Sequence, residues 1–98
     1  MALTNLTALN LRGAAQISGK DISSLTALKE LNLTDNQQYF NNALPKLTNL
    51  ETLTVQNSKM VTDKPLRDLT NLKILTVSNT ARINPDNLTH LKNLKIIQ

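Results

Sequence analysis

The chain repeats one apolar pattern every 22 residues, and this period restricts the fold more than any other feature of its sequence. A leucine opens each copy, and another leucine follows three residues later. The opening leucines are Leu3, Leu25, Leu47, Leu69 and Leu91. Such a period is typical of a solenoid, in which each coil buries its apolar face only against neighbouring coils. We therefore expect one domain over residues 1–98, with repeats at 3–24, 25–46, 47–68 and 69–90 and a partial copy at 91–98.

Numbered from the opening leucine, positions 1, 4, 7 and 9 are apolar in every complete copy. Positions 7 and 9 alternate with polar residues as in a β-strand, whereas positions 1, 4 and 7 follow a spacing of three. The pattern predicts short strands at 8–11, 30–33, 52–55, 74–77 and 96–98. Because one coil of constant length separates successive strands, the strands are predicted to be parallel.

The residues after each strand favour a turn. Position 11 holds residue types that tolerate a positive φ, namely Gly13, Asp35, Asn57 and Asn79. Position 12, with Ala14, Asn36, Ser58 and Thr80, is mostly small and polar, and we expect it to satisfy backbone groups of adjacent coils. Asparagine recurs at position 3, where we expect it to turn the chain into the strand. Helix-start signals at Asn41-Asn42, Asp63 and Asn84 predict a helical or 3-10 turn on the convex side of each coil.

The frame L-x-x-L-x-x-L-x-L with a polar residue at position 12 resembles the leucine-rich repeat family, and the 22-residue period resembles the repeats of bacterial internalins. The resemblance covers residues 3–98. It implies an α/β solenoid with a parallel sheet on its concave face and short helical or 3-10 turns on its convex side. It also implies a role in protein–protein interaction rather than catalysis, and a secreted or cell-surface location.

The residues offer little chemistry for an enzyme or a cofactor. The chain has no cysteine and a single histidine, His90, so it lacks a Cys–His pair and a cluster of soft metal ligands. Two glycines, Gly13 and Gly19, do not form a phosphate-binding loop. We therefore predict no catalytic residue, no metal and no cofactor, and we interpret His90 as a solvated residue.

The net charge of +4 is modest, although the basic excess lies after residue 68. Because no aromatic residues are interleaved with these basic residues, we expect no nucleic-acid partner. No apolar run approaches the length of a membrane span, so we expect a soluble chain without membrane insertion, and the sequence leaves its compartment open.

Positions 6, 8 and 10 alternate with the core positions and are therefore predicted to face outward on the concave side of the sheet. Position 6 holds Ala8, Glu30, Thr52, Ile74 and Ile96. Position 8 is uncharged and polar throughout, with Asn10, Asn32, Thr54, Thr76 and Gln98. Position 10 holds Arg12, Thr34, Gln56 and Ser78. An uncharged polar patch hydrogen-bonds a partner without the cost of burying charge, so we predict a protein-binding surface around Asn32, Thr54, Gln56 and Thr76.

Both aromatic residues, Tyr39 and Phe40, lie in the segment 37–42 and form a second candidate surface. Because position 15 is apolar in every copy, we expect one ring to be buried and the other displayed as an anchor for a partner.

Two other functions stay open at this point. The chain fits a structural spacer of a larger surface or effector protein, and its polar columns fit a carbohydrate-binding module, which the shortage of aromatic residues disfavours. We also expect self-association, because the first repeat begins at Leu3 and the last strand pattern ends at 96–98, which leaves the end layers uncapped.

Overall fold

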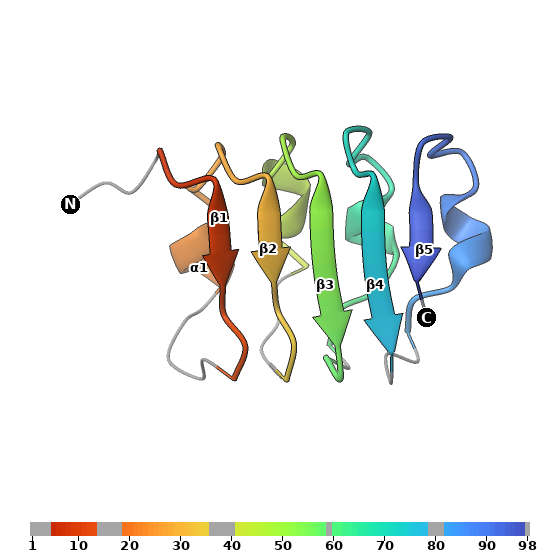
Figure 1. Ribbon diagram of the computed structural model, residues 1–98, viewed down its shortest axis with the longest axis horizontal. Helices are drawn as coiled ribbons and strands as arrows, with labels where there is room; N and C mark the ends of the chain where they lie inside the picture. Colours follow the sequence, from red (N-terminus) through yellow and green to blue (C-terminus); the bar gives the residue numbers. More distant parts are fainter. Residues whose placement is uncertain (1–4, 14–18, 36–40, 59, 79–81, 98) are drawn as a thin grey trace.

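A computed structural model describes residues 5–13, 19–35, 41–58, 60–78 and 82–97 of the chain. These residues form one parallel sheet in which the strands follow chain order (Figure 1). The strands are β1 (Ala8–Asn10), β2 (Glu30–Asn32), β3 (Thr52–Gln56), β4 (Ile74–Ser78) and β5 (Lys95–Ile97). The predicted parallel sheet is confirmed, and each strand lies within one or two residues of its predicted range.

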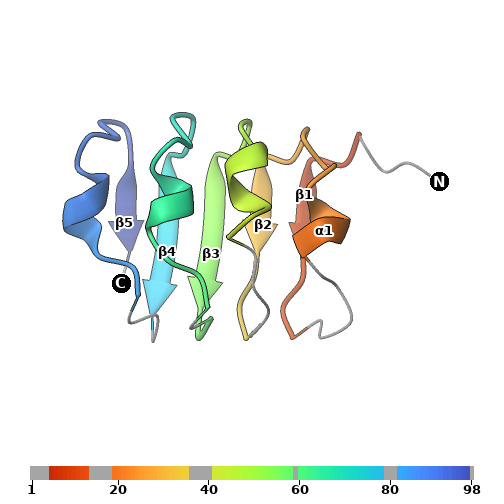
Figure 2. The same cartoon turned by 180° about the vertical axis from the view of Figure 1, so that it is seen from behind.

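Short helical segments cover the opposite side of each coil from the sheet (Figure 2). They are α1 (Gly19–Ile22) and the 3-10 turns η1 (Leu44–Lys46), η2 (Lys64–Leu66) and η3 (Pro85–Leu88). Each complete repeat therefore supplies one strand and one helical turn, and the predicted solenoid with a strand side and a helical side is confirmed. We call the side of the sheet that the turns leave uncovered the open face, which corresponds to the predicted concave face.

The core lies between the sheet and the helical turns and consists of stacked columns of leucine. Leu31, Leu53 and Leu75 are neighbours in the parallel register, and each is buried. The other leucine positions add further columns, so that Leu28, Leu50 and Leu72 are also buried. Aliphatic side chains of similar size recur at equivalent places in each coil, and this explains how the chain forms a core with only two aromatic residues.

In β1 to β4, strands with asparagine at position 8 are shorter than strands with threonine there. In β1 and β2 this residue is asparagine, and its side-chain oxygen accepts a hydrogen bond from the backbone N–H two residues later. Asn10 Oδ1 accepts from Arg12 at 3.0 Å, and Asn32 Oδ1 accepts from Thr34 at 2.9 Å. Both strands have three residues, and backbone hydrogen bonds to the next coil continue beyond them, from Gly13 N to Thr34 O at 3.0 Å and from Asp35 N to Gln56 O at 2.9 Å. In β3 and β4 position 8 is threonine, and each strand has five residues.

The turns after the strands follow the sequence prediction. Gly13, Asp35 and Asn57 adopt φ values of 68°, 59° and 54°. Ser58 is buried, and its hydroxyl donates to the carbonyl oxygen of Leu33 in the preceding coil. The predicted role of position 12 is therefore confirmed at Ser58. The other residues predicted at this position, together with Asn79, lie outside the described residues.

Asparagine at position 3, which was predicted to turn the chain into the strand, joins neighbouring coils at Asn49 and Asn71. The side-chain amides of Asn49 and Asn71 each donate at 2.9 Å to a carbonyl oxygen of the preceding repeat, on Thr26 and Thr48 respectively. The same bond therefore fixes the segment before β3 and the segment before β4 in equivalent positions relative to the preceding repeat.

The predicted 3-10 turns begin directly after Asp63 and Asn84, although only Asn84 makes a side-chain capping bond. Asn84 caps η3 by accepting from the N–H of Asp86 at 3.0 Å. Asp63 makes no capping bond to η2; its carboxylate instead accepts from the next coil, from Asn84 N at 2.9 Å and Asn87 Nδ2 at 3.0 Å. Asn41, at the same repeat position one coil earlier, accepts from Thr62 N at 3.3 Å and makes no cap for η1 either. These side chains therefore join neighbouring coils on the helical side.

The fifth strand departs from the predicted register by one residue. The repeat predicts that Ile74 pairs with Ile96, but Ile74 pairs with Lys95 and Thr76 with Ile97. Ile96 consequently packs against the core and Ile97 is 42% exposed, the reverse of the prediction. A shift of one residue exchanges the two faces of a strand. β1, the other edge strand, keeps the 22-residue register, so the shift is specific to β5.

Candidate binding face

The row of position-8 side chains on the open face brings predicted residues from four strands together. The register places Asn10 beside Asn32, Asn32 beside Thr54, and Thr54 beside Thr76. Asn32, Thr54, Thr76 and Gln56 are all half-buried, so each still offers surface to solvent. Gln56 lies at the end of β3, where it pairs with Ser78. Tyr39 and Phe40, the other predicted partner-binding residues, lie outside the described residues.

The two halves of this row differ in hydrogen-bonding capacity. The Oδ1 atoms of Asn10 and Asn32 already accept from their own backbone, so their Nδ2 groups are left as donors to an external group. Thr54 and Thr76 carry hydroxyl groups, which both donate and accept. A partner on β1 and β2 therefore meets amide donors, and a partner on β3 and β4 meets hydroxyls.

The position-10 column is more closed than the sequence predicts. Thr34 was predicted to face outward, yet it is buried, with an exposed fraction of 6%. β2 ends at Asn32, and Thr34 N donates to Asn32 Oδ1 at 2.9 Å. The hydroxyl of Thr34 has no hydrogen-bond partner in the described structure.

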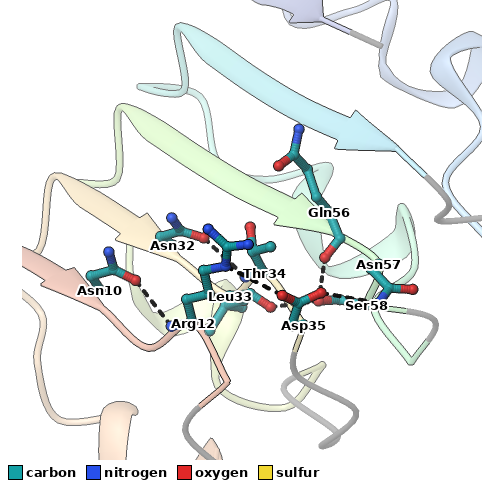
Figure 3. Close-up of polar contacts among 9 residues, drawn as sticks. All are labelled: Asn10, Arg12, Asn32, Leu33, Thr34, Asp35, Gln56, Asn57 and Ser58. Carbon is teal, nitrogen blue, oxygen red and sulfur yellow. Dashed lines mark hydrogen bonds and ion pairs between the residues drawn. The ribbon is translucent and has the colours of Figure 1, made fainter.

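A polar chain crosses the ends of the first three strands (Figure 3). Arg12 Nε donates to Asp35 Oδ2 at 3.2 Å, and Asn57 Nδ2 donates to Asp35 Oδ1 at 3.0 Å. The hydrogen bonds from Asn57 and then Arg12 hold the pKa of Asp35 below its ordinary value, because both favour the carboxylate. Arg12 was predicted as an open-face side chain, and its charge is already matched here.

A shallow depression lies on the first three strands of the open face, with a volume of about 450 Å³. Its lining consists of Ala8, Leu9, Asn10, Glu30, Leu31, Asn32, Thr52 and Thr54. Glu30 is the single charged residue in this lining, and it is exposed. The sequence prediction did not include Glu30. The signal was nevertheless present, since Glu30 is the one charged residue among all those predicted at positions 6 and 8.

Comparison with known proteins agrees with this geometry. No protein-family model matches the chain, and no curated protein matches it. Among solved structures, internalin C2 from Listeria monocytogenes str. 4b F2365 superposes with a TM-score of 0.81 and 27% sequence identity over 96% of this chain. The chain has an internalin-like leucine-rich repeat fold. It spans 42% of the length of the internalin C2 chain.

The leucine-rich repeat fold supports a protein-interaction module, since binding sites on solenoids lie on extended surfaces. The far half of the open face exposes two large apolar side chains, and the exposed Lys95 pairs with one of them, Ile74. Ile74 and Ile97 are 38% and 42% exposed. Thr76 lies two residues after Ile74 on β4, and it pairs with Ile97 on β5. The depression and these isoleucines are therefore the two chemically distinct parts of the face.

Other features of the leucine-rich repeat chain add no reactive site. His90 is exposed, as predicted, and its Nε2 lies 2.8 Å from the carbonyl oxygen of Arg67, to which it donates. Among the described residues no group of three or more His, Cys, Asp and Glu side chains is placed to hold a metal ion. A search of those same residues found no helix with the length and apolar character needed to cross a membrane.

Proposed function

We propose that this chain is a protein-binding module that holds its partner on the open face of the sheet, in contact with Asn32, Thr54, Gln56 and Thr76. The observation that carries the proposal is the uncharged position-8 row. Four adjacent strands present side chains that hydrogen-bond a partner without removing a charge from water. Leucine-rich repeat chemistry supports the same function, because each added coil widens one continuous surface.

The depression and the exposed isoleucines support a partner that contacts the whole width of the sheet. A protein interface combines an apolar part with hydrogen-bonding groups. Ile74 supplies apolar surface on β4, and the amides and hydroxyls supply the polar part. We propose that Tyr39 and Phe40, which lie outside the described residues, also contact the partner.

The test compares two double variants in a partner capture experiment. Thr54→Arg with Thr76→Arg places two large charges in the middle of the open face, and Thr48→Arg with Thr70→Arg makes the same changes at exposed residues before the strands. Surface substitutions change stability by about 0.5 kcal/mol or less each, so both variants are expected to fold. Proteins retained by the immobilised chain are identified by mass spectrometry, and the Kd of each purified candidate is then measured.

We expect the open-face variant to lose the partner and the Thr48 and Thr70 variant to retain it. A partner that binds the open-face variant as well as the native chain would refute binding on this surface. If none of the purified proteins binds and the chain functions as a rigid connector, these results would instead favour the structural spacer alternative.

A further inference from the structure

We infer that the depression around Glu30 binds a lysine or arginine side chain from an extended segment of the partner, while Asn10 and Asn32 donate to carbonyl oxygens of that segment. The inference rests on the proposed function and names the chemistry of the partner at this part of the face. Three features support it: the charge of Glu30, the space beside Glu30, and the direction of the Asn10 and Asn32 donors.

Charge is the first argument. Glu30 is exposed, and within the described part of the chain its carboxylate has neither an ion pair nor a hydrogen bond. The other acidic residue near the strands, Glu51, is matched, since its Oε1 lies 3.6 Å from Lys73 Nζ. Arg12 is matched by Asp35. The carboxylate of Glu30 is therefore the charge on this half of the face that an incoming cation meets.

Space is the second argument. Glu30 pairs with Ala8 on one side and Thr52 on the other, and both side chains are small. The depression of about 450 Å³ lies at these residues, and it accommodates the long stem of a lysine or arginine. Such a stem packs its methylene groups against apolar surface while its charged end reaches the carboxylate. A charge-assisted hydrogen bond is stronger than a neutral one, so Glu30 favours this occupant over an uncharged side chain.

Donor direction is the third argument. The Oδ1 atoms of Asn10 and Asn32 accept from Arg12 N and Thr34 N, which fixes the amides with Nδ2 as the free donor. Both asparagines lie two residues beyond the Ala8 and Glu30 pair, at about 6.6 Å along the strand. A peptide segment carries both a cationic side chain and carbonyl acceptors at this separation. A neutral sugar leaves the carboxylate without a counter-charge, and an acidic segment is repelled by Glu30.

The test uses three blocked heptapeptides of alternating threonine and valine that carry lysine, glutamine or glutamate at the centre. Each is titrated into the 15N-labelled chain, and the Kd is taken from backbone amide shifts. We expect the lysine peptide to bind about tenfold more tightly than the glutamine peptide, a difference of about 1.4 kcal/mol. The largest shifts are expected at Glu30 and its paired residues, and the glutamate peptide is expected to bind most weakly.

The matched variants are Glu30→Gln and Glu51→Gln, each of which removes one negative charge. Glu30→Gln is expected to abolish the preference for lysine, while Glu51→Gln retains it. Equal loss in both variants would overturn the inference, because net charge rather than the Glu30 depression would then explain the preference. An equal Kd for the lysine and glutamine peptides would also overturn it.

A second variant tests the same site without removing the carboxylate. Ala8→Arg places a guanidinium beside Glu30 and fills the depression, so the lysine peptide is expected to lose its advantage. The natural partner then separates this inference from the proposed function. A partner that is lost with Thr54→Arg and Thr76→Arg but binds Glu30→Gln and Ala8→Arg normally would uphold open-face binding and refute the role of Glu30.

Discussion

Replacement of Leu53 tests the register of the central coil most directly. Leu53 has no exposed surface and lies in the middle strand, with Leu31 and Leu75 as its paired neighbours. Leu53→Ala removes three carbon groups, which amounts to about 2.4 kcal/mol at about 0.8 kcal/mol for each buried group. Because the coils on both sides hold the neighbouring leucines in place, a cavity remains and raises the total to about 3 to 5 kcal/mol.

Leu53→Asp is expected to have a larger effect. The carboxylate would enter the leucine column without a partner, and the penalty of several kcal/mol adds to the loss of the leucine. Against a total stability of about 5 to 15 kcal/mol, this is expected to unfold the chain at 25 °C. Thr54→Ala is the control, because the next residue faces the open side and its truncation is expected to cost about 0.5 kcal/mol or less.

The assay is urea denaturation followed by circular dichroism, with the free energy of unfolding extrapolated to water. We expect Leu53→Ala to lower the midpoint with an unchanged slope, and Leu53→Asp to show no cooperative transition. A loss of less than about 1 kcal/mol for Leu53→Ala would refute the reasoning. So would equal losses for Leu53→Ala and Thr54→Ala, because β3 would then not alternate between a core side and an open side.

Two further predictions concern polar contacts between coils. Ser58→Ala removes the buried donor to Leu33 O and is expected to lower the free energy of unfolding by about 1 to 3 kcal/mol in the same urea assay. Ser23→Ala is the control, because it loses an exposed hydrogen bond and is expected to change this free energy little. Burial would raise the pKa of Asp63, but hydrogen bonds from Asn87 and Asn84 outweigh burial and lower it. As pH falls, the unfolded chain takes up the proton first, so the stability that Asp63 contributes is complete above about pH 3.9 and is lost below it. In urea titrations, the native chain is therefore expected to be more stable than Asp63→Asn at pH 7, and this difference is expected to shrink at pH 3. A difference that stays constant between the two pH values would contradict the prediction.

The architecture could be predicted because the same physical requirement recurs in every copy. Apolar residues at positions 1, 4, 7 and 9 are buried when each coil covers the next. Leu31, Leu53 and Leu75 show this, because they pair across three neighbouring strands. Turn chemistry was equally predictable, since Asp35 and Asn57 belong to the residue types that adopt positive φ at low cost. Repetition turns a weak local signal into a strong one.

The candidate face was predicted less completely, because its details depend on contacts between coils. The strand pattern placed Thr34 outward, but β2 ends at Asn32, whose side chain accepts from Thr34 N, and Thr34 is buried. Asp63 resembled a helix cap, but its Oδ2 accepts from two donors of the next coil, Asn84 N and Asn87 Nδ2. The register shift is specific to β5, since β1, the other edge strand, keeps the 22-residue register.

The asparagine at position 8 connects strand length to the chemistry of the face. β1 and β2 have three residues each, and in both the asparagine Oδ1 accepts from the backbone, which leaves Nδ2 as the donor on the open face among the described residues. β3 and β4, with Thr54 and Thr76 at this position, have five residues each and present a hydroxyl instead. The choice between two polar residues at position 8 therefore gives β1 and β2 amide donors around the carboxylate of Glu30, and β3 and β4 hydroxyls beside exposed isoleucine.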